Sequence, residues 1–160
     1  MASTIIDQIV DDVKTAIAAI STGGGYETDV ESVYEPLTVK GYTKPPMKSF
    51  QVQLTLVDPE RNEDIDLQGN PPRVGWTQPI ETALMYRPSD SATTPIRTVL
   101  NKFWSDVIKA VQSDPYRAGL AIDTRITDPA WFINDADGYV GISCFINIIY
   151  RHKENNPYEQ

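Results

Sequence analysis

The chain offers few side chains that could act as a catalytic nucleophile or base. Its 160 residues include one histidine, His152, and one cysteine, Cys144. A Ser-His-Asp or Cys-His mechanism would have to use His152, which lies in a polar segment close to the C-terminus, where chain ends are mobile. Cys144 lies in an apolar run without a neighbouring Lys, Arg or His to activate its thiol, and such a thiol is commonly buried. The sequence therefore predicts no catalytic residue and no enzymatic activity.

One acidic segment could be taken for part of a metal site. Residues 135–138, DADG, resemble the first half of a calcium loop but lack the later acidic ligand at the required spacing. Asp and Gly also favour turns, so we interpret the segment as a polar turn between strands. Sites built from His and Cys are excluded by their number. We expect no metal and no cofactor, and a carboxylate-based enzyme or calcium-binding module using Asp135 and Asp137 is the least favoured alternative.

The charge of the chain argues against a nucleic-acid-binding protein. The net charge is −8 and the pI is near 4.5, whereas neutralising phosphates requires clustered Lys and Arg. The densest basic group, Lys40, Lys44 and Lys48, is interrupted by Pro45 and Pro46, so we expect a solvated loop there. An acidic surface would also let a DNA duplex pass without adhering to it.

A single domain over residues 1–160 is the expected organisation, since a chain of this length buries roughly two thirds of the surface that it exposes when unfolded. Asp7, Asp11 and Asp12 interrupt the apolar residues near the N-terminus, which is not the pattern of a signal peptide. No apolar run is long enough to cross a bilayer. We therefore expect a soluble protein that has no membrane partner and is assembled in the cytoplasm.

Two amphipathic helices are predicted from apolar residues that repeat at three- and four-residue intervals. The first covers residues 3–20, with Ser3 as its N-cap and Gly23–Gly25 after its end. The second follows Thr94, which we expect to be its N-cap, and Pro95, a favoured first helical residue. It is expected to end before Asp114-Pro115, because the residue before a proline avoids the helical conformation.

Strands are predicted where apolar residues alternate with others. The expected strands are residues 26–36, with a twist or bulge near its end, and residues 50–56, 76–87, 120–126 and 140–150. Pro79 argues for an edge strand or a late strand start. Residues 37–48 and 58–73 are expected to be loops, 128–138 a turn-rich segment and 151–160 a polar C-terminal tail. The sequence therefore predicts an α+β fold, with an antiparallel or mixed sheet of about five strands and the two helices packed on one face.

Several segments together resemble tail terminator (tail completion) proteins of long-tailed bacteriophages. They are the N-terminal helix, YETDVESVYEP (26–36), FQVQL (50–54), FWSDVIKAVQSDP (103–115), GLAIDTRI (119–126) and DGYVGISCFINIIYRH (137–152). The resemblance is best over residues 99–151, and the loop at 58–73 departs from it. It implies an α+β structural virion protein that caps the end of the tail tube as a hexameric ring, stops tube polymerisation and provides the interface for head attachment.

The partners that the resemblance implies are further copies of the chain, the tail tube protein and a head-tail connector or neck protein. DNA would pass nearby without specific binding, and the protein would lie at the head-proximal end of the virion tail. The alternative within virion assembly is that the chain is itself a head-tail connector or neck (head completion) protein.

Loops set on a rigid sheet commonly carry the contacts of such a protein, so we expect subunit or tube contacts in the segments 37–48 and 58–73. The candidate residues are Lys44, Lys48, Glu60, Arg61, Asp64, Arg73 and Trp76. Arg61, Arg73 and Trp76 are the expected anchors, because Arg and Trp dominate interface energetics. An equally weighted alternative for Trp76 is that its ring belongs to the core.

Overall fold

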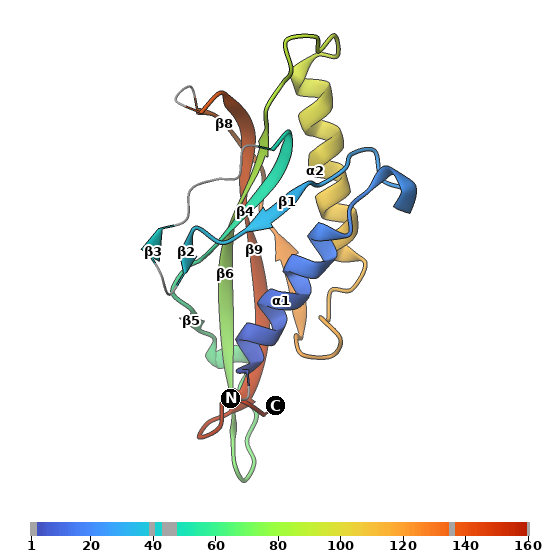
Figure 1. Cartoon of the computed structure of the whole chain (residues 1–160). Helices are drawn as coiled ribbons and strands as arrows, with labels where there is room; N and C mark the ends of the chain where they lie inside the picture. Colours follow the sequence, from blue (N-terminus) through green and yellow to red (C-terminus); the bar gives the residue numbers. More distant parts are fainter. Residues whose placement is uncertain (1–2, 39–40, 43–47, 135–136, 160) are drawn as a thin grey trace.

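Two helices and a seven-stranded mixed sheet form the main body of the protein (Figure 1). The computed structural model describes residues 3–38, 41–42, 48–134 and 137–159. The elements are α1 (Ile5–Ala18), η1 (Thr22–Gly24), β1 (Ser32–Tyr34), β2 (Leu37–Thr38), β3 (Gly41–Tyr42), β4 (Phe50–Leu56), β5 (Glu60–Arg61), η2 (Glu63–Ile65), β6 (Arg73–Tyr86), α2 (Ile96–Gln112), β7 (Asp123–Ile126), β8 (Ala130–Asn134) and β9 (Tyr139–Lys153). The predicted α+β fold class is confirmed.

The sheet is organised around its two longest strands, β6 and β9. They pair antiparallel without interruption from Arg73 opposite Lys153 to Tyr86 opposite Val140. The strand order is β1-β4-β6-β9-β7, with β5 also paired to β6 and β8 also paired to β9. The sheet is mixed because β1 runs parallel to β4, whereas the other pairs are antiparallel. β2 and β3 form a separate two-stranded sheet.

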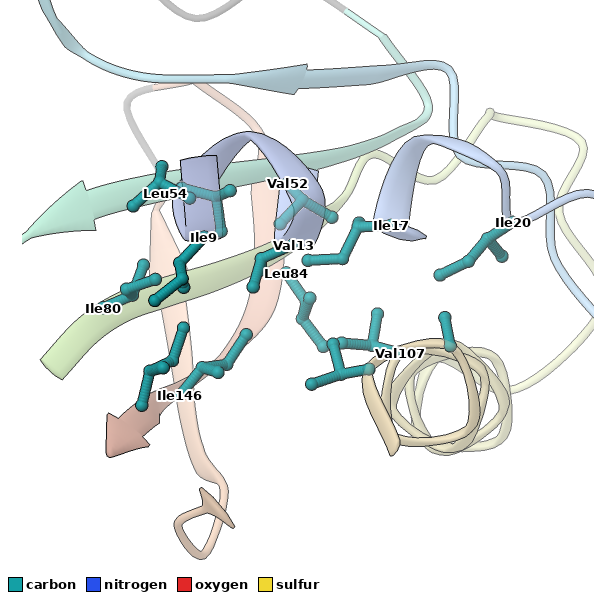
Figure 2. Close-up of a cluster of buried hydrophobic side chains, with 14 of the residues drawn as sticks. Ile9, Val13, Ile17, Ile20, Val52, Leu54, Ile80, Leu84, Val107 and Ile146 are labelled. Atoms are coloured by element: carbon teal, nitrogen blue, oxygen red, sulfur yellow. The ribbon is translucent and has the colours of Figure 1, made fainter. Parts of the chain in front are cut away.

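The main core lies between one face of this sheet and the two helices. Figure 2 shows Ile9 and Val13 of α1 pointing toward the sheet, where Val52, Ile80 and Leu84 are fully buried. On α2, the stripe through Leu100, Phe103, Val107 and Val111 is likewise buried in this cluster. Because each fully buried side chain of this kind contributes about 1.5–3 kcal/mol, this contact holds the helices on the sheet.

The opposite face of the sheet carries a smaller apolar cluster. Tyr34, Met85 and Tyr139 are buried there, and Phe132 packs against them. Gly141 makes this packing possible, because a Cβ at this position would lie only 2.4 Å from the Leu84 carbonyl oxygen and 2.4 Å from Cζ of Phe132.

The helix ends differ slightly from the prediction. Thr4, not Ser3, caps α1: its Oγ1 accepts the Asp7 amide at 3.2 Å, and the Asp7 carboxylate accepts the Thr4 amide at 3.1 Å. This reciprocal capping box satisfies two backbone donors, which a cap by Ser3 would not. Thr94 is not the cap of α2 either, because Pro95 occupies that position without a side-chain cap. The end of α2 at Gln112, before Asp114-Pro115, agrees with the prediction.

Two strand predictions were wrong because backbone groups find other partners. The strand expected over residues 26–36 is reduced to Ser32–Tyr34, since the amides of Glu27 and Thr28 donate to a helix side chain instead of a strand. The turn expected over 128–138 contains β8, which pairs with β9 from Ala130 opposite Ser143 to Asn134 opposite Tyr139.

Pro79 lies inside β6, not at an edge or before the strand. Its carbonyl oxygen accepts the Val57 amide at 3.2 Å, so the proline nitrogen also faces the β4 side. At this point β4 has ended at Leu56 and β5 has not yet begun. The missing N–H of proline therefore removes no bond from the ladder between β6 and β9.

The predicted loop at 58–73 and the predicted tail at 151–160 both contain regular structure. β5 and η2 lie in the former, and β9 continues to Lys153 in the latter. The segment after β9 folds back on the chain, because the Pro157 carbonyl accepts the Ile5 amide at 3.0 Å and the Glu159 carbonyl accepts the Lys153 amide at 2.9 Å. Within the described ranges, no helix has the length and apolarity needed to span a bilayer.

Asp106 fixes the segment after α1 to α2. Its side chain is buried on the apolar stripe of α2. Its Oδ2 accepts the Glu27 amide at 3.0 Å, the Thr28 amide at 2.8 Å and the Thr28 hydroxyl at 2.7 Å. A buried carboxylate with three donors is well satisfied, whereas its removal leaves those donors without an acceptor.

We expect Asp106→Ala to lower the free energy of unfolding by about 3 kcal/mol, because buried donors lose a charged acceptor. Asp11→Ala, at an exposed position of α1, is the control and should change it by less than about 0.5 kcal/mol. Urea unfolding of both variants measures the difference. Equal effects would contradict the role given to Asp106.

Gly141→Ala should cost about 1–3 kcal/mol, since the added methyl group overpacks the contact between β9 and Phe132. Gly23→Ala is the matched control, because a Cβ there meets nothing within 4 Å. Thermal unfolding of the two variants tests this, and an undisturbed Gly141→Ala protein would argue against the packing of β8 on β9.

Candidate functional site

Most of the predicted interface residues lie together at one end of the ladder between β6 and β9. Glu60 and Arg61 form β5, and Arg61 lies opposite Trp76 in β6. Asp64 is an exposed residue of η2, and Arg73 begins β6. These residues come from separate parts of the 58–76 segment, and the pairing of β5 with β6 brings them to the same end of the sheet.

The two predicted lysines are not part of this group. Lys48 is exposed and precedes β4, whose first residue, Phe50, lies opposite Tyr86 at the far end of β6. Lys44 lies outside the described residues. The structure therefore does not bring Lys48 close to Arg73.

A stack of planar side chains organises this end of the sheet. The Arg61 guanidinium lies 5.6 Å from the centre of the Trp76 ring. On β9, the His152 ring lies nearly parallel to Trp76, with an angle of 9° and a centroid distance of 6.1 Å. His152 is thus held in a strand and not in a mobile tail, and its Nδ1 lies 2.8 Å from the Lys153 carbonyl oxygen. Cation–π contacts and ring stacking of this kind each contribute up to about 1 kcal/mol.

Asp66 holds the Arg61 side chain in this stack by an ion pair. One carboxylate oxygen accepts from Nη2 of Arg61 at 2.5 Å, and the other accepts the Gly75 amide at 2.7 Å. Nη1 of Arg61 donates to the Gly75 carbonyl at 2.9 Å. The sequence analysis did not predict these contacts of Asp66 and His152, because Asp66 binds residues five and nine positions away on two paired strands, and His152 stacks on Trp76 of a different strand.

Trp76 is half-buried and packs against the main core, which is the alternative that the sequence left open. Its Nε1 is buried and has no hydrogen-bond partner among the described residues. An interface role for Trp76 stays a prediction.

The other face of the same end is basic. Arg73 lies directly opposite Lys153, and Arg151 is its diagonal neighbour on β9. Arg73 and Arg151 line a pocket of about 190 Å³ together with Gly119, Ala121 and Ile122. Within the described ranges, Lys153 has an ion pair, with Glu159, but neither arginine has one. Like charges opposite one another on a ladder are unfavourable, so this basic surface is suited to an acidic partner.

An apolar groove lies at the opposite end of the ladder, where the sequence analysis expected only a turn. It occupies about 550 Å³ between β8, the start of β9 and the first turns of α2, and we call it the β8 groove. Its lining residues are Ile96, Leu100, Trp131, Phe132, Ile133 and Val140. Ile133 is 72% exposed, Trp131 51% and Ile96 41%. The run of three large apolar residues at 131–133 was the sequence signal for this surface.

Cys144 is buried in β9, and burial raises the pKa of its thiol to about 12. The Asp137 carboxylate accepts from the Asn134 side chain at 3.2 Å, and Asp135 lies outside the described residues. Within those ranges, no group of three His, Cys, Asp or Glu side chains is placed to hold a metal ion.

Comparison with known proteins assigns the chain to no family. No family model matches it. No curated protein matches it significantly. The functional inference therefore depends on the resemblance described above, the fold and the two surfaces at the ends of the ladder.

Cys144 should react only when the protein unfolds. A thiol with a pKa of about 12 is almost entirely protonated at pH 8, and the thiolate is the reacting form. We expect a disulfide reagent to label the folded protein at least about a hundredfold more slowly than the protein in denaturant. Equal labelling rates would show that the thiol is accessible and ionisable in the folded state.

Proposed function

We propose that the chain is a structural virion protein that caps the end of a phage tail tube as a ring, stops tube polymerisation and provides the interface for head attachment. The observation that carries this proposal is the β8 groove. Trp131 and Ile133 expose large apolar side chains beside it, and contiguous apolar surface of this kind marks an interaction site. The resemblance of residues 99–151 to tail terminators supplies the kind of assembly.

A ring-forming cap needs contacts to neighbouring subunits and contacts to what lies above and below the ring. The molecule has two chemically different surfaces at opposite ends of one rigid ladder: the apolar β8 groove, and the polar end that carries Glu60, Arg61, Asp64 and Arg73. We assign the first to contacts between subunits. The second is assigned to the tail tube protein or the head-tail connector, since Arg73 and Arg151, which have no ion pair among the described residues, favour an acidic partner surface.

The net charge of −8 is compatible with a position on the DNA path. Acidic side chains facing a channel repel the phosphates of a passing duplex, which lowers adhesion. In this proposal the protein is assembled in the host cytoplasm and lies at the head-proximal end of the tail.

The test is a capping assay with the tail tube protein of the same phage. Added during polymerisation, the chain should stop elongation, and electron microscopy should show added density at one end of each tube. Tubes that elongate to the same length with bare ends would contradict the proposal. Density at the portal vertex instead of the tube end would favour the alternative of a connector or neck protein.

Arg73→Glu should weaken capping, so that about tenfold more protein is needed for the same tube length, because an interface arginine is replaced by a repelling charge. Lys102→Glu is the charge-matched control, since Lys102 lies on α2 and its ion-pair partner among the described residues is the exposed Glu27. A loss of capping equal in both variants would point to net charge and not to the surface around Arg73.

A further inference from the structure

β8 is an edge strand whose outer side has no strand partner in the described part of the chain. Among the described residues it pairs with β9 alone, so one row of its backbone N–H and C=O groups faces outward. Trp131 and Ile133 lie opposite Ile142 and Val140, on the helix side of the sheet, and both border the β8 groove. An uncovered apolar edge of this kind is a template for pairing with another strand.

These features define the chemistry of the occupant. A strand added to β8 would satisfy the outward backbone groups, and every second side chain would fall into the groove between β8 and α2. A helix could fill the groove but would leave those backbone groups without partners. The fitting occupant is therefore an extended segment with apolar side chains on one face.

The opposite edge of the same sheet carries such a segment. β1 pairs with residues 51–53 of β4 and leaves the following residues without a described strand partner on that side. Leu56 is 47% exposed and Val57 39% exposed. A notch of about 90 Å³ lies beside them, lined by Glu35, Pro36, Leu54, Thr55 and Leu56.

We propose that the end of β4 in one copy of the chain pairs with β8 of the next copy, so that the sheet continues from subunit to subunit. β4 and β8 run in opposite directions within the sheet, because β4 is antiparallel to β6, β6 to β9 and β9 to β8. A neighbour in the same orientation therefore pairs antiparallel. Leu56 then lies on the same face as Trp131 and Ile133, since its partner Ile80 points to the helix side.

Charges at the two edges support a second copy as the occupant. Arg97 follows Ile96 at the groove, and Arg87 follows Tyr86, which lies opposite Val140. Asp58 follows the end of β4. No described residue forms an ion pair with any of these three side chains, so a head-to-tail contact brings opposite charges to the two edges.

The contact joins two different surfaces, and a head-to-tail contact of this type generates a ring when its rotation closes. The inference rests on the proposed function, because it names the contact by which the proposed ring closes.

The experiment uses one substitution on each edge: Ile133→Lys on β8 and Leu56→Lys on β4. Native mass spectrometry and light scattering should show an oligomer for the wild-type chain, and either substitution alone should weaken association by about thirtyfold or more. An equimolar mixture of the two variants should form a one-to-one dimer and nothing larger, since a single intact pair of edges remains. Tyr116→Lys, at a position that is 59% exposed in the turn between α2 and β7 and belongs to neither β8 nor β4, is the control and should leave the oligomer intact.

Circular dichroism and thermal unfolding of each variant show that a loss of association is not a loss of fold. The inference is overturned if the wild-type chain is monomeric at every concentration, if both variants associate normally, or if their mixture stays monomeric. Normal association of Leu56→Lys with loss of association in Ile133→Lys would also overturn it, because β8 would then pair with itself. If the wild-type chain caps tubes and neither substitution weakens its association, the edge contact is refuted and the proposed function stands. If both substitutions weaken association as expected but the wild-type chain does not cap tubes, the proposed function is refuted and the edge contact stands.

Discussion

The structure depends on a mismatch in length between its central ladder and its helices. β6 and β9 pair over fourteen positions, or about 45 Å at the rise of a strand. α1 and α2 have 14 and 17 residues, or about 21 Å and 25 Å at the rise of a helix. Neither helix can cover the apolar face of the ladder from end to end, so both ends of the sheet need other partners.

The two ends meet this requirement differently. At the Arg73 end, β5, η2 and the segment after β9 fold back, and the Arg61–Trp76–His152 stack covers the sheet with side chains of the chain itself. At the other end nothing described covers Trp131 and Ile133, although β8 adds a strand to the edge. The same ladder thus presents a closed polar surface and an open apolar one, and the proposed ring would use the first for its axial partners and the second for its neighbouring subunits.

Sequence patterns predicted the helices and strands whose apolar side chains are buried in the core. They did not predict elements whose contacts lie far away in the sequence or whose side chains are exposed. The stripes of α1 and α2 and the alternation of β4 and β9 were readable because their apolar residues face the core. Asp106 interrupts such a stripe, yet its donors at Glu27 and Thr28 are almost eighty residues away and no local pattern indicates them. β8 was missed because Trp131 and Ile133 alternate on an exposed surface. Pro79 is tolerated inside β6 because β4 has already ended beside it. The residues around Pro79 do not show where β4 ends, so the sequence did not predict this.

The central claim is that copies of this chain form a closed ring by joining unlike edges of one continuous sheet. The most direct measurement is a cryo-electron microscopy map of the chain bound at the end of a tail tube. The account predicts a ring in which β8 of each subunit lies antiparallel to residues 54–56 of the next. A single bound copy, or a ring in which Trp131 and Ile133 face solvent, would contradict it.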